Sequence, residues 1–160
     1  RSYSLYVDKL QEWYEKNVAK DFPKLRQQAL HLLQEEAELN EIVQLVGVDS
    51  LSFTDRLKLE TAPSIREDYL HQNAFHEIDT FTSTTKQYLL LKMILGWHEA
   101  AVKTVSEGGS FKKIVEMGAR EQIGRFKYVE EAQMQEQYEA ILADMTAEFD
   151  EIAQKEEQLA

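Results

Sequence analysis

Carboxylates and histidines are the side chains of this sequence that could bind a metal ion, so their spacing is the first question. Asp68 and His71 form a D-x-x-H motif, but a carboxylate-bridged di-metal bundle needs two E-x-x-H motifs and two further glutamates on facing helices. An acidic run lies beside an apolar stripe, which is typical of a solvated helix face (Glu35, Glu36, Glu38 and Glu41). The histidines lack the i, i+4 spacing of a helical metal site and are interpreted as structural or exposed (His31, His71, His76 and His98). The sequence predicts no metal site.

Catalytic motifs are also absent from the chain. It has no G-x-x-x-x-G-K-[ST] phosphate loop, no G-x-G-x-x-G fingerprint, no H-E-x-x-H and no G-x-S-x-G nucleophile turn. It has no cysteine, which excludes disulfides, thiolate metal sites and cysteine nucleophiles. We therefore expect neither catalytic residues nor a bound cofactor within this chain.

Two segments carry aromatic or apolar side chains where no helical stripe requires them. Phe75 and Phe81 fall in an expected loop over 71–82, where they either anchor the loop on its own domain or stack on a flat ring. The turn from Asp49 to Asp55 displays Leu51 and Phe53, which either cap the local core or contact a partner.

The elements that must position these residues are helices. Six Gly and two Pro punctuate the chain, and apolar residues recur at helical spacing over 5–18, 21–46, 53–70 and 83–105. The last of these is the most apolar and is the expected core helix. A final helical region begins at 111 and is expected to continue toward the C-terminus. The fold class predicted is all-α, a helical bundle.

Local signals set the expected helix ends. Asp21, Ser52 and Ser110 have the residue type and position of N-caps. Gly47 is expected to end the second helix, and Pro63 to bend or split the third.

The acidic charge is concentrated in the C-terminal part of the chain. The 160 residues carry a net charge of −11, but residues 130–160 hold ten acidic side chains and one basic one, which leaves −2 for residues 1–129. We expect a helical bundle over 1–129 and a long acidic C-terminal helix over 130–160, with an apolar seam at three-four-seven spacing (Tyr138, Ile141, Met145, Ile152 and Leu159). The acidic balance disfavours nucleic-acid partners, and no apolar run is long enough to enter a membrane.

Four stretches together resemble a known family. They are SYSLY at 2–6, LQEEAELNEIVQLVG at 33–47, DSLSFTDRLKLE at 49–60 and REDYLHQNAFHEIDTFTS at 66–83. Their order and spacing are similar to the C-terminal helical domain of the catalytic A subunit of V-type and archaeal-type rotary ATPases. The resemblance covers roughly residues 2–129, and the acidic tail follows the family only in being helical and acidic.

The resemblance implies a fragment of an ATP-driven or ATP-forming motor that moves protons or sodium. The parent subunit would bind ATP or ADP with Mg through a phosphate loop outside this chain. It would assemble with B subunits and a central-stalk subunit, on the cytoplasmic side of a membrane-bound complex. Since Arg1 stands where a start Met would, a fragment of a longer chain is expected.

The same resemblance implies two sites in this chain. The turn would be the tip that pushes on the central stalk (Asp49, Leu51, Ser52, Phe53 and Asp55), although Phe53 and Thr54 replace acidic positions of the related F-type loop. Phe75 and Phe81 would line the adenine pocket of the assembled subunit. The alternative is a free-standing helical adaptor that binds partner proteins through its acidic C-terminal helix.

Overall fold

The computed structural model describes residues 19–70 and 81–159, with side chains over 20–70 and 84–155. Its helical elements are α2 (Ala19–Val46), η2 (Val48–Ser50), α3 (Phe53–Ser64), η3 (Ile65–Leu70), α5 (Phe81–Ser106), α6 (Phe111–Val115), α7 (Gly118–Arg125), η4 (Phe126–Tyr128), η5 (Glu131–Gln133) and α8 (Met134–Leu159). No strand occurs in these two ranges. The all-α prediction is confirmed, while the helix expected over 5–18 lies outside the described residues.

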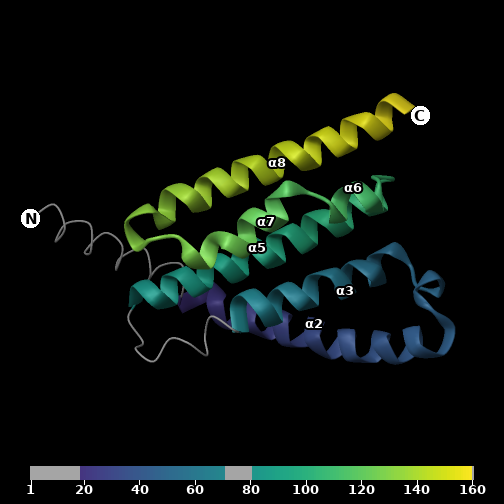
Figure 1. The fold of residues 1–160 in the computed structure, drawn as a ribbon, viewed down its shortest axis with the longest axis horizontal. Helices are drawn as coiled ribbons and strands as arrows, with labels where there is room; N and C mark the ends of the chain where they lie inside the picture. Colours follow the sequence, from purple (N-terminus) through teal and green to yellow (C-terminus); the bar gives the residue numbers. More distant parts are fainter. Residues whose placement is uncertain (1–18, 71–80, 160) are drawn as a thin grey trace, which may run out of the picture.

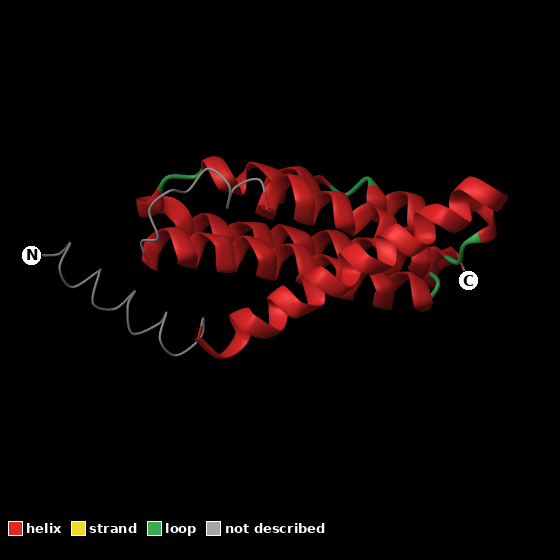
Figure 2. Ribbon diagram, turned by 90° about the horizontal axis from the view of Figure 1, so that it is seen from below, coloured by secondary structure: helices red, strands yellow, loops and turns green. Residues whose placement is uncertain are grey.

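The helices form three layers, with α5 in the middle layer. The hairpin of α2 and α3 lies on one side of α5, and α6, α7 and α8 lie on the other (Figure 1). Seen from the hairpin side, α2 crosses the helices behind it obliquely (Figure 2). The hairpin tip lies at one end of the molecule (Figure 1), and the start of α3 there packs near α6.

Helix α5 is the core helix, as the sequence predicted. It is buried on several sides because both outer layers pack on it, and its fully buried side chains include Tyr88, Leu89, Leu90, Leu91 and Met93. No helix in the described part is long and apolar enough to cross a membrane.

The predicted N-cap role of Asp21 is wrong. Asp21 lies inside α2, which is already helical at Ala19, and its carboxylate accepts a hydrogen bond of 3.2 Å from the Tyr88 hydroxyl. The Tyr88 ring also packs edge-on against Phe22, with ring centroids 5.6 Å apart. Burial, with the hydrogen bond to Asp21, raises the pKa of Tyr88 to about 12. Asp21 thus joins α2 to the core helix instead of starting a helix.

Near Pro63, which was expected to bend or split the helix, the helix changes type without a break in the helical run. Pro63 lies in the last turn of α3, and from Ile65 the chain continues as the π-helical segment η3. Proline has no N–H to donate to the preceding turn, which weakens the helix at this point. The wider turn of η3 places Asp68 against Lys127, with the carboxylate and ammonium 3.0 Å apart.

The helical region expected from residue 111 onward consists of several separate helices. Ser110 caps α6 as expected, accepting from the Lys113 amide at 3.3 Å, but the chain then divides into α6, α7 and α8. The start of α7 is capped by a residue of another helix. The Glu148 carboxylate of α8 accepts hydrogen bonds from the amides of Gly118 and Ala119, both at 2.8 Å. A carboxylate compensates the unpaired N–H groups of a helix start.

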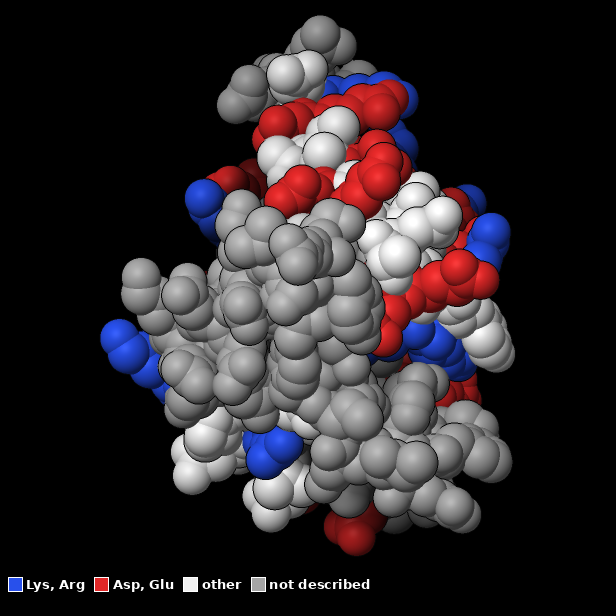
Figure 3. Space-filling view, turned by 90° about the vertical axis from the view of Figure 1, so that its left-hand side faces the viewer, with Lys and Arg blue, Asp and Glu red and all other residues white. Residues whose placement is uncertain are grey.

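Helix α8 is amphipathic, as predicted. The expected seam residues Tyr138, Ile141, Met145 and Ile152 are buried, together with Met134 and Phe149, and the helix packs on α5 and α7. The Leu159 side chain lies outside the described residues. Acidic side chains gather on the outer surface where α8 lies in Figure 1, at the top of the face shown in Figure 3.

Arg120 of α7 ties the layers together. Its guanidinium donates to the Glu60 carboxylate at 3.0 Å, to the Glu60 carbonyl at 3.1 Å and to the Val115 carbonyl at 2.8 Å. It also lies over the Trp97 ring, 4.6 Å from the centroid. One side chain thereby links α3 of the hairpin to α5 and α6.

Candidate functional site

The tip of the α2–α3 hairpin is built by local signals that the sequence shows. Gly47 ends α2 with a φ of 86°, a left-handed conformation that favours glycine. Ser52 caps α3 by accepting from the Asp55 amide at 3.2 Å. The Ser50 hydroxyl donates to the Gly47 carbonyl at 2.8 Å, which closes the turn between the two helices.

Apolar side chains are exposed at this tip. Leu45 is 84% exposed and Val46 is 65% exposed, and their exposed neighbours are Ile42, Val48 and Phe53. Ile42 and Val46 continue the helical spacing of apolar residues expected for 21–46, but the last buried residue of α2 is Leu39. The apolar stripe of α2 therefore continues past its last buried residue. Periodicity alone does not show which residues of such a stripe are buried and which are exposed.

The residues predicted for the tip do lie together there, but their side chains are already engaged. The Asp49 carboxylate lies 3.2 Å from the Arg56 guanidinium, and the Asp55 carboxylate lies 3.4 Å from the Lys58 ammonium. Ser52 is the helix cap, and Leu51 is half-buried. Each tip carboxylate is therefore partly neutralised by a cation of α3.

Phe53 packs on its own domain and is also exposed at the tip. Its ring stacks on the ring of Phe111, with centroids 5.2 Å apart and planes at 21°, yet the residue remains 52% exposed. The Arg56 guanidinium lies 5.4 Å from the centroid of the same ring. No sequence signal pointed to Phe111 as its partner, since the two residues are far apart along the chain.

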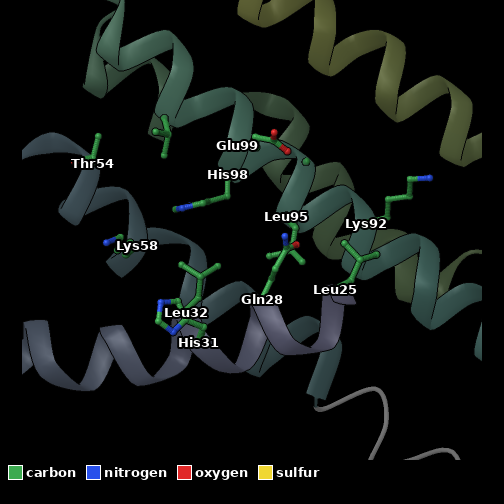
Figure 4. A pocket seen from close by; sticks show the side chains of 12 residues that line it. Leu25, Gln28, His31, Leu32, Thr54, Lys58, Lys92, Leu95, His98 and Glu99 are labelled. Atoms are coloured by element: carbon green, nitrogen blue, oxygen red, sulfur yellow. The ribbon is translucent and has the colours of Figure 1, made fainter. Parts of the chain in front are cut away.

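Beside the hairpin, a groove of about 700 Å³ runs between α2, α3 and α5 (Figure 4). Its apolar wall includes Leu25, Leu32, Leu95 and Val102, and its polar lining includes Lys58 and His98.

Polar contacts hold the hairpin together next to this groove. The Lys58 ammonium of α3 pairs with the Glu35 carboxylate of α2, and this hydrogen bond raises the pKa of Lys58 although burial opposes it. Arg66 pairs with Glu36 in the same way. The interpretation of Glu35 and Glu36 as a purely solvated face is therefore wrong, because their carboxylates pair with cations of α3 and η3, respectively.

His98 has a structural position at the groove. Its Nδ1 lies 2.6 Å from the Thr61 hydroxyl. Burial lowers the pKa of His98, and the Lys58 charge lowers it further, against an opposing effect of Glu35. Within the described ranges no group of three or more histidine and acidic side chains is arranged to hold a metal ion.

The two aromatic residues predicted for an adenine pocket cannot be placed. Phe75 and the Phe81 side chain lie outside the described residues. The backbone of Phe81 is the first residue of α5 instead of part of a loop, so this helix begins two residues before the expected start. Helix ends are the least certain part of a prediction from periodicity.

Comparison with known proteins gives one consistent family. Residues 11–115 match the family model for the C-terminal domain of V and A type ATP synthase. The V-type ATP synthase alpha chain of Acetivibrio thermocellus is 49% identical over 158 residues, which is 99% of this chain and 27% of that protein. The corresponding alpha chain of Thermoanaerobacter pseudethanolicus is 53% identical over 133 residues, covering 83% of this chain and 22% of that protein.

A further relative, the V-type ATP synthase alpha chain of Clostridium botulinum (strain Okra / Type B1), is 47% identical over 154 residues, which is 96% of this chain and 26% of the relative. The chain thus spans about a quarter of the length of the curated relatives it matches. The family match covers the whole hairpin with its tip, all of the core helix α5 and all of α6. This chain belongs to the family of C-terminal domains of V and A type ATP synthases.

Proposed function

We propose that this chain is the C-terminal part of a catalytic subunit in a rotary ATP synthase or ATPase that couples ATP chemistry to proton or sodium transport. The names and lengths of its relatives support this assignment. The subunit's phosphate loop, Mg site and catalytic residues would then lie outside this chain, which has no such motif. The chain alone should not hydrolyse ATP, and measurable ATPase activity of the purified chain would contradict the proposal.

The role proposed for this domain is to transmit nucleotide-driven motion to the central stalk. The observation that carries it is the exposed apolar end of the hairpin, at Leu45 and Val46. Exposed apolar clusters on folded domains mark contact surfaces. The stalk contact would include the tip residues that the resemblance implied (Asp49, Leu51, Ser52, Phe53 and Asp55). Because each of the two tip carboxylates is paired with a cation, the push would be steric and apolar more than charge-based.

The tip proposal can be tested in the assembled motor. The double variant Leu45→Ser, Val46→Ser should reduce stall torque and the number of ions moved per ATP hydrolysed. Leu30→Ser is the matched control, because Leu30 is 58% exposed on the same helix but lies away from the tip. Unchanged torque and coupling in the tip variant would overturn the proposal.

An adenine-contacting role for Phe75 and Phe81 remains part of the proposal. An aromatic face can hold a base by stacking, and the phosphates would be bound by the upstream domain. Phe75→Ala in the whole subunit should raise KM for ATP. An unaltered KM would remove this assignment.

The other partners proposed are the B subunits, in a complex peripheral to a membrane on its cytoplasmic side. A boundary between a bundle over 1–129 and an extension over 130–160 also remains a proposal. The alternative of a free-standing adaptor is less favoured, since the apolar seam of α8 is buried against α5 and α7. Only the acidic face of α8 would be left for an adaptor to use.

A further inference from the structure

The Phe53 ring at the tip packs against another ring of the same domain, that of Phe111. Phe53 and Phe111 stack with centroids 5.2 Å apart, and each is the first residue of a helix that follows a serine cap. The contact therefore joins the start of α3 to the start of α6. A stack of this kind has a preferred geometry, so it restricts the angle between the two helix starts.

The support extends to the turn itself. Arg56 lies over the Phe53 ring at 5.4 Å and pairs with Asp49 of η2 at 3.2 Å. The side chains of Asp49, Arg56, Phe53 and Phe111 thus form one connected set, the tip cluster. Through it the turn η2, the start of α3 and the start of α6 are held in one arrangement.

Helix α6 is itself well fixed to the core. Ile114 is fully buried, and the last residue of α6, Val115, accepts a hydrogen bond of 2.8 Å from Arg120. A short helix anchored in this way can resist a sideways displacement of Phe111. A force applied to the tip would then reach the core through Phe111 as well as along α2 and α3.

We propose that Phe111 is a positioning residue, which sets the angle of the hairpin tip through Phe53 so that Leu45 and Val46 meet the partner surface. This inference rests on the proposed function of the tip. It gives Phe53 a supporting role in addition to its proposed share of the contact, because its ring links the exposed tip to Phe111. Phe111 itself needs no contact with the partner.

The test uses the full-length subunit in the assembled motor, with Phe111→Ala, Phe53→Ala and the double variant. Phe111→Ala should lower the number of ions moved per ATP hydrolysed while the ATP hydrolysis rate is retained. The double variant should be no worse than Phe53→Ala, because both changes remove the same stack. Phe111→Tyr keeps the ring and should restore the coupling.

Amide hydrogen exchange gives an independent measure of tip movement. Loss of the stack should speed exchange at the tip amides, residues 48–53, by about two- to tenfold, the range expected for one aromatic stack. Exchange in the middle of α5 should not change. If Phe111→Ala leaves the tip exchange unchanged, or slows hydrolysis and transport in parallel, the positioning role is wrong.

The outcome also separates this inference from the proposed function. If Leu45→Ser, Val46→Ser lowers coupling and Phe111→Ala does not, the tip contact stands and the positioning role is overturned. If neither variant lowers coupling, the tip contact itself is wrong and the positioning role falls with it. A tyrosine at 111 that fails to restore coupling would also overturn the inference.

Discussion

Replacing Arg120 with Met tests whether the hairpin is held to the rest of the domain by this side chain. The guanidinium makes three hydrogen bonds, to both the side chain and carbonyl of Glu60 and to the Val115 carbonyl. Methionine keeps an apolar stem that can pack on Trp97, but it has no N–H donor. The substitution therefore removes the polar link between α3 and α6 with little change in volume.

The expected loss follows from these contacts. Each hydrogen bond to a backbone carbonyl contributes about 1 kcal/mol. The ion pair adds about 0–1 kcal/mol, since the Glu60 side chain is 40% exposed. The contact of the Arg120 guanidinium with the Trp97 ring adds about 0.5–2 kcal/mol. Because the contacts share one side chain and are not additive, we expect a loss of about 2–4 kcal/mol, or roughly 5–10 °C in Tm.

Guanidinium chloride unfolding of the 160-residue chain, followed by circular dichroism, measures this change. Arg125→Met is the matched control on the same helix, because Arg125 is 73% exposed and pairs only with Glu121 among the described residues; its loss should stay within about 0.5 kcal/mol. Arg120→Lys should fall between the two, since one ammonium cannot span all of the acceptors. If Arg120→Met costs no more than Arg125→Met, the linking role is wrong.

Three further predictions concern pH and helix capping. His98 is half-buried with a lowered pKa. Its contribution to stability is present above about pH 7 and falls as the pH drops through the ordinary histidine value, because the unfolded chain then takes up a proton that the folded chain does not. His98→Gln should therefore flatten the stability profile between pH 7.5 and 5. Tyr88 has a pKa of about 12, so stability should decline between about pH 10 and 12, because its hydroxyl ionises first in the unfolded chain. An ultraviolet titration of Tyr88→Phe should lack this late-ionising tyrosine. Glu148→Ala removes the cap of α7 and should cost about 1–2 kcal/mol in denaturant unfolding, whereas an unchanged midpoint would exclude a capping role.

Features set by neighbouring residues could be predicted from the sequence. Ser52 and Ser110 are caps because a hydroxyl three residues before an amide can reach it within one turn. Gly47 ends α2 because it adopts a positive φ at no steric cost. The seam of α8 and the central position of α5 followed from helical periodicity. All of these depend on contacts within about a turn or on the side of a helix that is apolar.

Features set by distant residues could not be predicted in this way. Glu148 caps α7 across 30 residues of chain, and a continuous helical pattern gives no sign that another helix will supply such a cap. The stack of Phe53 on Phe111 and the pairing of Glu35 with Lys58 likewise depend on how helices pack. Periodicity shows which side of a helix is apolar, but it does not show where the core ends along that helix.

The hairpin shows why this limit matters for function. Up to Leu39, α2 is held by buried apolar contacts and by ion pairs to α3 and η3. Its last two turns carry exposed Ile42, Leu45 and Val46. In an isolated domain such a surface gains nothing for folding and favours aggregation. An apolar end is advantageous only where another surface covers it. The apolar stripe that predicts a packed helix in the sequence is exposed at the end of α2 in the structure, and this exposure supports the proposed contact.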